Sequence, residues 1–380
     1  LAGLAQQGDT RLLLTSREAP PAPLDGVAIR LGPLSKREGR ALIAGVLAQA
    51  GRAPAGDSTE RRVDELIEKV GGHARSLVLL APLVAERGLQ VTAETVAQEM
   101  AELEAKNPGV REFSLLASVR LSLDRLPETA HRQVKAFAVF HGAVNYEVLA
   151  QVLEVQPDAA LALCRQLVEF GLAGAQGPYL FPDPALGPAV AVEVTDEERC
   201  GMEERWIGAS MRLIDFLYEM HFRDAQVAME GTQAALQDLM AAMAQAEQKV
   251  GAQVFSVEMV MMSVTRLQTL GRTLGRPTVL AQLEELRQRL GRQLEDWSHA
   301  QFESARTEIE EKLATGNISG ALASATSLDE RAEASWTSYP EAYYDRALAN
   351  LLLGRALRTA SRASEALLYL ERQRRDSLKR

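Results

Sequence analysis

The sequence is poor in the residues and segments that mark exported or membrane-spanning proteins. Among its 380 residues only Cys164 and Cys200 are cysteines, and both lie in helix-like apolar patterns. This usage disfavours a disulfide framework and favours a reducing compartment. No apolar run reaches the ~18 residues that a membrane-spanning helix needs, and the first residues lack the charged-then-apolar layout of a signal peptide. We therefore expect a cytoplasmic protein without a membrane partner.

Motifs of several enzyme classes are missing as well. The sequence contains no G-x-x-x-x-G-K-[ST] phosphate loop, no H-E-x-x-H pair and no G-x-S-x-G nucleophile turn. Its five histidines do not fall at a metal-ligand spacing, which disfavours a zinc site. Without a phosphate loop or a metal-binding acidic strand end, these residues alone cannot hydrolyse ATP. Whether the chain belongs to an enzyme stays open, and we do not expect it to be a complete one.

The sequence has fewer basic than acidic residues. The chain has 42 Lys and Arg against 51 Asp and Glu, so its net charge is −9. This balance disfavours a polyanion-binding surface over the whole molecule, and nucleic acid is not expected as a partner. The hydrophobic share of 47% and the charged share of 24% are typical of globular proteins, and the length suggests two to three domains.

The N-terminal region has two short apolar runs, at 12–14 and 27–31, separated by a proline-rich segment. They predict two buried strands of a parallel sheet within residues 1–34. Two strands do not make a stable sheet by themselves, and the chain starts at Leu1 rather than at Met. We therefore expect further strands upstream and a chain cut from a longer one.

Residues 35–109 predict a small helical domain. Apolar residues recur at i, i+3, i+4 and i+7 in two stretches, 63–70 and 77–84, as on one face of a helix.

Three local signals refine this domain. Asp57 with Glu60 suggests a capping box, and Thr92 suggests a further helix start. Asn107-Pro108-Gly109 interrupts the helical pattern and is the expected domain boundary.

Residues 110–196 predict a winged-helix domain. The expected elements are helices at 115–126, 128–140, 146–155 and 158–170, then a hairpin of 172–175 with 179–181. Asp183 is expected to cap a helix that begins at Pro184. The helix at 158–170 offers only Arg165 as a basic residue, which disfavours DNA reading.

Residues 197–380 lack strand signals and predict an all-helical domain. The expected breaks between helices are Gly251, Gly275, Gly291, Gly316 and Gly354. Two pieces, 316–322 and 359–367, resemble each other, and their matched alanines Ala321 and Ala366 lie 45 residues apart. This period is longer than the ~34 residues of a tetratricopeptide repeat, so we expect an irregular array of that kind. A chance likeness of Ala- and Leu-rich helices is the alternative.

The predicted fold is therefore mainly α. It comprises a remnant of a parallel α/β nucleotide-binding sheet (1–34), a small helical domain (35–109), a winged helix (110–196) and a tetratricopeptide-like α-helical repeat array (197–380). This order, with the stretches 13–17, 31–38 and 71–77, resembles the C-terminal part of the nucleotide module of STAND ATPases, the NB-ARC-like signal-transduction class.

The resemblance implies residues that bind ATP or ADP together with an upstream phosphate loop. By position, Arg17 at a strand end would sense the terminal phosphate, and Arg suits this role because its guanidinium forms two parallel bonds to phosphate oxygens. A loop arginine that only solvates the strand end is the alternative.

The segment Gly71-Gly72-His73-Ala74 stands where the family has a Gly-Gly-x-Pro turn that packs against adenine. Two glycines allow close approach of the backbone to a flat base. Ala74 replaces the family's proline, and a plain helix C-cap explains the two glycines equally well.

The stretch Asp183-Pro184-Ala185-Leu186 stands where relatives have a histidine that reaches a phosphate. The negative charge of aspartate would repel that phosphate, so we do not expect Asp183 to bind it.

Two functions are compatible with these features. In the first, helical repeats sense a protein partner or ligand, and the winged helix relays the nucleotide state to an upstream effector. Self-association would accompany the active state. In the second, the chain is a nucleotide-independent interaction scaffold whose NTPase module has decayed.

Overall fold

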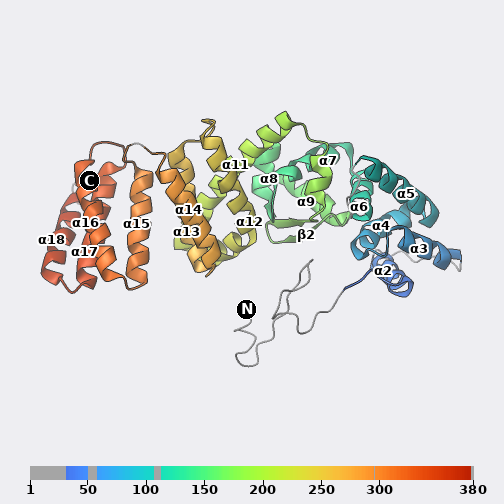
Figure 1. Cartoon of the computed structure of the whole chain (residues 1–380), viewed down its shortest axis with the longest axis horizontal. Coiled ribbons are helices and arrows are strands. Elements are labelled where there is room, and N and C mark those ends of the chain that lie inside the picture. Colours follow the sequence, from blue (N-terminus) through green and yellow to red (C-terminus); the bar gives the residue numbers. More distant parts are fainter. Residues whose placement is uncertain (1–30, 50–57, 107–112, 295, 378–380) are drawn as a thin grey trace, which may run out of the picture. The chain divides into compact units, whose positions relative to one another are not determined.

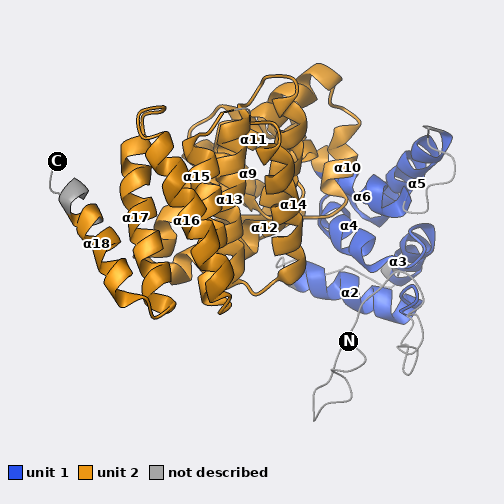
Figure 2. Cartoon of the chain, turned by 60° about the vertical axis from the view of Figure 1, so that its left-hand side comes forward, with its two compact units in different colours: residues 1–122 blue, residues 123–380 orange. Residues whose placement is uncertain are grey.

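The computed structural model describes residues 31–49, 58–106, 113–294 and 296–377, which are mainly α-helical as predicted (Figure 1). The chain divides into two compact units, residues 1–122 and 123–380, coloured separately in Figure 2. The division falls inside one helix, and the four finer domains expected from the sequence stay a prediction.

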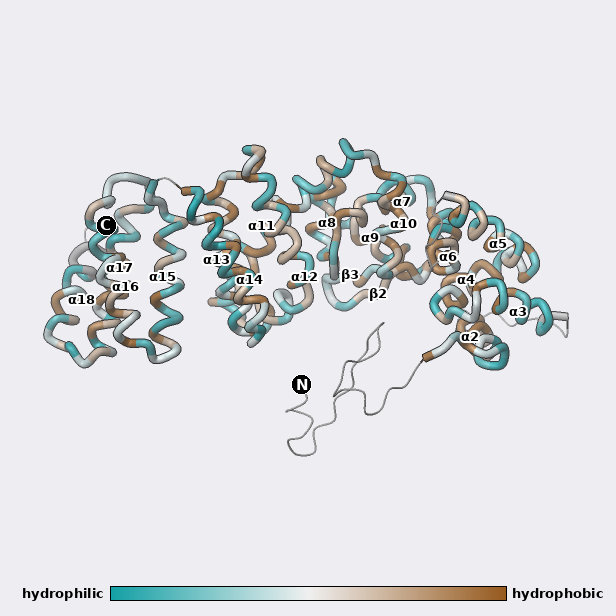
Figure 3. The backbone as a smooth tube through the Cα atoms, in the orientation of Figure 1, coloured by the Kyte–Doolittle hydropathy of each residue, from teal (hydrophilic) through white to brown (hydrophobic). Residues whose placement is uncertain are grey.

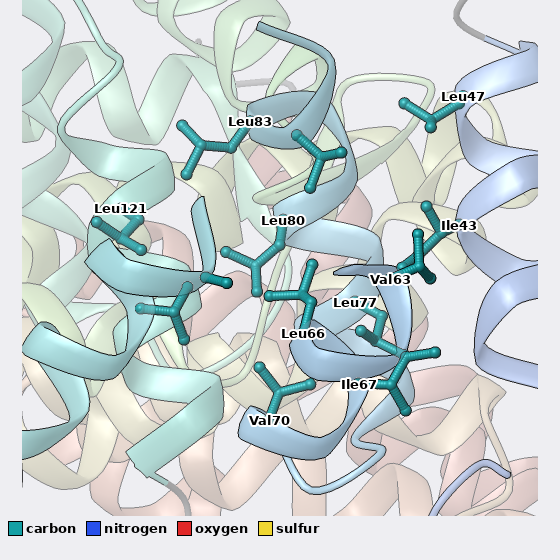
Figure 4. Packing of buried hydrophobic residues seen from close by; sticks show 13 residues of the cluster. Ile43, Leu47, Val63, Leu66, Ile67, Val70, Leu77, Leu80, Leu83 and Leu121 are labelled. Carbon is teal, nitrogen blue, oxygen red and sulfur yellow. The ribbon is translucent and has the colours of Figure 1, made fainter. Parts of the chain in front are cut away.

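The first unit is a small helical assembly. Its helices are α2 (Lys36–Gln49), α3 (Ser58–Lys69), α4 (Ala74–Arg87), α5 (Leu89–Lys106) and most of α6 (Phe113–Leu123). Their apolar faces meet in one core, in which Leu66, Leu77 and Leu80 are fully buried (Figure 4). These residues belong to the two periodic stretches 63–70 and 77–84, so the spacing predicted the buried faces of α3 and α4 correctly.

The prediction of a helix start at Thr92 is wrong. Helix α4 ends at Arg87, because its C-cap Gly88 has a φ of 86° that breaks the helical path, and α5 begins directly afterwards at Leu89. Thr92 lies in the first turn of α5, and its hydroxyl donates to the Gly88 carbonyl at 2.8 Å. Its side chain therefore satisfies a backbone group from inside the helix.

The second unit begins with a small α+β portion. Its elements are α7 (Glu128–Gln133), η1 (Val134–Val139), β1 (Val144–Asn145), α8 (Tyr146–Leu153), α9 (Pro157–Glu169), β2 (Ala173–Gln176), β3 (Tyr179–Pro182) and α10 (Leu186–Ala191). The strands form an antiparallel sheet of order β1-β3-β2, in which Val144 pairs with Leu180 and Ala175 pairs with Leu180 from the other side. This topology is that of a winged helix.

Two details of this portion differ from the expectation. The helix predicted at 128–140 is α-helical only to Gln133 and then tightens into the 3-10 segment η1. Strand β1 was not predicted. It has only two residues, so no alternation of side chains is visible in the sequence.

The predicted helix start at Pro184 is also wrong. Helix α10 begins at Leu186, and Asp183 is buried ahead of it. The Asp183 carboxylate accepts from the Ala185 N–H at 2.9 Å, which makes a local turn rather than a helix cap.

The rest of the second unit is a series of helix pairs. The helices are α11 (Asp196–Arg223), α12 (Ala225–Val250), α13 (Val257–Thr273), α14 (Pro277–Gly291), α15 (His299–Ala314), α16 (Ile318–Ala334), α17 (Ala342–Thr359) and α18 (Ala363–Ser377). The first helices of successive pairs, α11, α13, α15 and α17, contact one another in turn. Hydrophilic and hydrophobic residues alternate along these helices, as expected where each buries one face (Figure 3).

The last two pairs repeat the same turn. Gly316 and Ser361, 45 residues apart, both have left-handed φ angles, of 77° and 62°. One residue later, the Asn317 N–H donates to the Lys312 carbonyl and the Arg362 N–H to the Leu357 carbonyl, at 2.8 and 2.9 Å. These paired donors are again 45 residues apart. The same kind of helix end also follows α8 and α9, at Glu154 and Gly171, so the turn is a common C-cap and the true repeat stays a prediction.

Gly354 does not interrupt a helix, contrary to the expectation. It lies inside α17, where a Cβ atom would approach the side chain of Leu370 in α18 to 2.9 Å. The missing side chain therefore lets two helices pack closely.

Several predictions fall outside the described residues. They concern the strand at 12–14, nearly all of the strand at 27–31, Asp57 and the boundary at 107–109. Within the described part of the chain, no helix is both long and apolar enough to span a membrane.

Candidate functional sites

The segment Gly71–Ala74 is the tight connection between α3 and α4. Gly71 and Gly72 have φ angles of 59° and 65°. The Gly72 N–H donates to the Ile67 carbonyl at 2.8 Å, and the Gly71 N–H donates to the Glu68 carbonyl at 3.0 Å. The two glycines thus terminate α3 in the way that the C-cap alternative required.

The same connection is held against the segment before α2. The Leu34 N–H donates to the Gly72 carbonyl at 2.9 Å, and a Cβ on Gly72 would lie 2.6 Å from the Leu34 carbonyl oxygen. His73 then caps α4, because its Nδ1 accepts from the Ser76 N–H at 3.3 Å. Gly72 and His73 therefore have structural roles, whether or not a base also contacts them.

The predicted nucleotide residues are not brought together in the described structure. Arg17 lies outside the described residues, and Gly71, Gly72, His73 and Ala74 form the turn just described. Binding of ATP or ADP by these five residues stays a prediction.

A second candidate site is a groove of about 1000 Å³ inside the second unit. It lies between the winged-helix portion, which contributes the start of α8 and the β2–β3 hairpin, and the helix pair α11–α12. Volumes of this size are typical of ligand sites. We call it the wing groove.

Apolar side chains are unusually open to solvent in the wing groove. Phe181 on β3, Phe216 on α11 and Val227 on α12 expose 41%, 52% and 43% of their surfaces. Exposed aromatic groups gathered in a hollow are typical of interaction sites. The sequence did not single these residues out, because they come from three separate elements.

The floor of the wing groove is closed by tight packing. A Cβ on Gly231 of α12 would lie 2.6 Å from Leu217 of α11 and 3.1 Å from the Tyr179 hydroxyl. Glycine at this position therefore lets α12 approach both α11 and the sheet.

The charged groups of the wing groove are mainly acidic. Glu147 and Glu230 line the groove, and within the described part of the chain they accept hydrogen bonds from Tyr146 and Gln226 and form no ion pair. Arg212 is bound to the side-chain oxygen of Gln151. A ligand with a basic group beside an apolar one would complement this lining.

Beside the wing groove, a buried carboxylate joins the winged-helix portion to the helix pair. Asp238 of α12 accepts from the Trp206 indole N–H at 2.9 Å and from the His141 backbone N–H at 2.8 Å. Burial raises the pKa of Asp238 to about 6, against the effect of these two hydrogen bonds. The three residues link α11, α12 and the chain after η1 in one network.

Comparison with known proteins adds one distant likeness. No family model and no curated protein matches the chain. Among solved structures, the chain is similar to a signal transduction ATPase with numerous domains (STAND) protein with a tetratricopeptide repeat sensor from Pyrococcus horikoshii, at 12% identity and a TM-score of 0.35. The match covers 92% of this chain and 54% of that one, so the chain spans about half of its length. A likeness at this level carries no conclusion about function.

Proposed function

We propose that this chain is the partner-sensing part of a regulated, nucleotide-dependent signalling switch. The observation that carries the proposal is the wing groove, because its walls come from both the winged-helix portion and the first helix pair. A partner bound there contacts both, so its binding energy depends on their mutual placement. Such differential binding is what shifts a switch between states.

The chemistry of the wing groove favours a peptide segment of a protein partner. An aromatic or long aliphatic side chain fits beside Phe181, Phe216 and Val227, and a neighbouring Lys or Arg fits Glu147 or Glu230. Aromatic side chains in a desolvated pocket commonly carry most of the binding energy of an interface.

The test of partner binding uses an array of synthetic peptides that each carry one Phe flanked by Lys, with a Glu-flanked series for charge comparison. We expect Phe216→Ala to weaken binding of the Lys-flanked peptides about tenfold, equivalent to about 1.4 kcal/mol. Phe222→Ala is the matched control, because Phe222 is also on α11, is 69% exposed and lies outside the wing groove. Equal losses in both variants would exclude the groove as the partner site.

The nucleotide arm of the proposal rests on the resemblance of Arg17 and of the turn Gly71–Ala74 to the STAND pattern. ATP or ADP would require upstream residues that supply a phosphate loop. Calorimetry of the intact protein with ADP tests this arm, and Arg17→Ala is expected to alter the response to ATP more than folding. Identical nucleotide dependence in the variant would refute a phosphate-sensing role.

The second candidate is an interaction scaffold that works without nucleotide. Ala74 and Asp183, both departures from the family pattern, favour it. Under this function, partner binding would persist and ADP would have no effect. Micromolar ADP binding by the intact protein would exclude it.

A further inference from the structure

Three side chains of types that can ligate a metal meet between the last two helix pairs, far from the wing groove in sequence. His299 is the first residue of α15, Glu303 follows one helical turn later on the same face, and Asp345 belongs to α17. Their ligating atoms all lie within 4.8 Å of one another. Within the described part of the chain, these three residues are the set of three or more His, Cys, Asp or Glu side chains whose ligating atoms lie this close to one another.

The burial of this group is unusual for charged residues. Asp345 is fully buried, the Glu303 side chain is only 12% exposed, and His299 is half-buried. Burial raises the pKa of Glu303, since the charged carboxylate loses water. Two carboxylates in a poorly hydrated space require compensating positive charge.

The described partners of these carboxylates are one arginine, one histidine and one tyrosine hydroxyl. Arg306 pairs with one Glu303 oxygen at 3.0 Å and also donates to the Tyr218 hydroxyl. Nδ1 of His299 lies 2.9 Å from both Asp345 oxygens, and the Tyr339 hydroxyl donates to one of them at 2.9 Å.

We propose that His299, Glu303 and Asp345 form a binding site for a divalent transition-metal ion, with Zn²⁺ the best match. One imidazole nitrogen and two carboxylate oxygens are a ligand set that Zn²⁺ takes, whereas Mg²⁺ and Ca²⁺ prefer oxygen alone. Two ligands at ~2.0–2.1 Å in a tetrahedral site lie about 3.3 Å apart, so ligand atoms that now lie within 4.8 Å of one another must draw closer around the ion. The ion takes the place of the proton between His299 and Asp345.

A metal at this position links consecutive repeats. Two ligands come from α15 and one from α17, which are the first helices of neighbouring pairs. Three protein ligands leave a fourth coordination position for water or for a group of a partner. The sequence spacing did not reveal the site, because Asp345 follows His299 by 46 residues and only the packing of α15 on α17 brings them together.

The experiment is a calorimetric titration of the untagged, chelator-treated protein with ZnCl₂, and a parallel thermal unfolding series. We expect one ion per chain with a micromolar or lower Kd, and a rise in Tm with ion concentration. MgCl₂ at the same concentrations is expected to have no such effect.

The variants His299→Gln and Glu303→Gln test the ligands. Glutamine at position 299 still offers an N–H to Asp345 but is a poor zinc ligand, so the fold is expected to persist while affinity falls at least about tenfold. His221→Gln on α11 is the matched control, since His221 is not one of the three grouped residues. Circular dichroism confirms that each variant is folded.

Two results would overturn the proposal. One is the absence of stoichiometric Zn²⁺ binding at concentrations up to about 1 mM, which would leave a proton-bridged His–Asp pair only. The other is unchanged affinity in both folded ligand variants, which would place any bound zinc elsewhere. Neither result bears on the wing groove, so this proposal and the proposed function fail separately.

Discussion

At the scale of single residues, the second unit buries acidic groups where aliphatic ones are usual. Asp238 and Asp345 are both buried, and each receives two described hydrogen bonds from different parts of the chain. Removing one partner of such a group costs more than the hydrogen bond itself, because the other partners remain desolvated. These carboxylates therefore determine which segments lie next to each other.

Asp238 should make stability depend on pH. Its pKa is about 6 in the folded protein, against 3.8 for the free group, so the folded state binds the proton more tightly. The contribution of this residue is thus largest below pH 4 and is lost as the pH rises through 6. Relative to Asp238→Asn, which does not titrate, the wild type should lose about 2–3 kcal/mol of unfolding free energy between pH 4 and 7. Urea unfolding of both proteins at several pH values measures this, and a difference that is constant with pH would contradict it.

The two neighbouring glycines at the end of α3 should respond differently to alanine. Both have positive φ, so either substitution strains the backbone by roughly 1 kcal/mol. At Gly71 the new Cβ meets nothing within 4 Å, whereas at Gly72 it lies 2.6 Å from the Leu34 carbonyl. We expect Gly72→Ala to be the more destabilising by about 1–3 kcal/mol in chemical unfolding of the first unit. Equal effects would mean that the contact between Leu34 and Gly72 contributes nothing.

At the scale of elements, helix pairing depends on where side chains are missing. Gly354 of α17 and Gly208 of α11 are both mid-helix glycines. A Cβ on Gly208 would meet only an Arg212 side-chain nitrogen, at 3.7 Å, whereas on Gly354 it meets Leu370 at 2.9 Å.

Alanine at these two glycines should therefore act in opposite directions. Gly208→Ala is expected to stabilise by about 0.5–1 kcal/mol through helix propensity. Gly354→Ala has the same gain in helix propensity, but the new methyl group is expected to push α18 away from α17. This loss of packing exceeds the gain, so Tm is expected to fall. Thermal unfolding of both variants measures these effects. A rise of Tm in both variants would show that α18 moves to accept the new methyl group without loss of stability.

The elements that the sequence predicted well are those whose signal is local. The buried faces of α3 and α4 follow from spacing alone, and the β2–β3 hairpin follows from its Gly177-Pro178 turn. The elements that were missed depend on distant residues. Strand β1 exists because Val144 and Asn145 pair with β3. Gly354 suits the interior of α17 because Leu370 of α18 lies where a side chain would be.

At the scale of the whole molecule, the two units have separate cores. Leu66 lies in the core of the first unit and Phe302 in a core of the second, and both are fully buried. Leu66→Ala should lower one calorimetric transition by the equivalent of about 2–5 kcal/mol, and Phe302→Ala should lower another by about 3–5 kcal/mol. A single transition that both variants lower together would show that the units unfold as one.

The candidate sites also differ in whether their residues are close together in the sequence. The turn at Gly71–Ala74 is visible in the sequence because its residues are consecutive. The wing groove and the His299–Asp345 group are not, because each is assembled from helices or strands that only the tertiary fold makes neighbours. Sequence motifs therefore could not have located either of these two candidate sites.

The repeated turn at Gly316 and Ser361 has a consequence for how the array can change in length. Because both turns have a residue with left-handed φ followed by the same closing hydrogen bond, we expect that residue 316 joined directly to residue 362 would keep this turn. Such a crossover removes one 45-residue unit and connects α15 to α18 in the geometry that already connects α17 to α18. A chain that lacks residues 317–361 is therefore expected to keep α11 and α18 while its helical array is shorter by two helices.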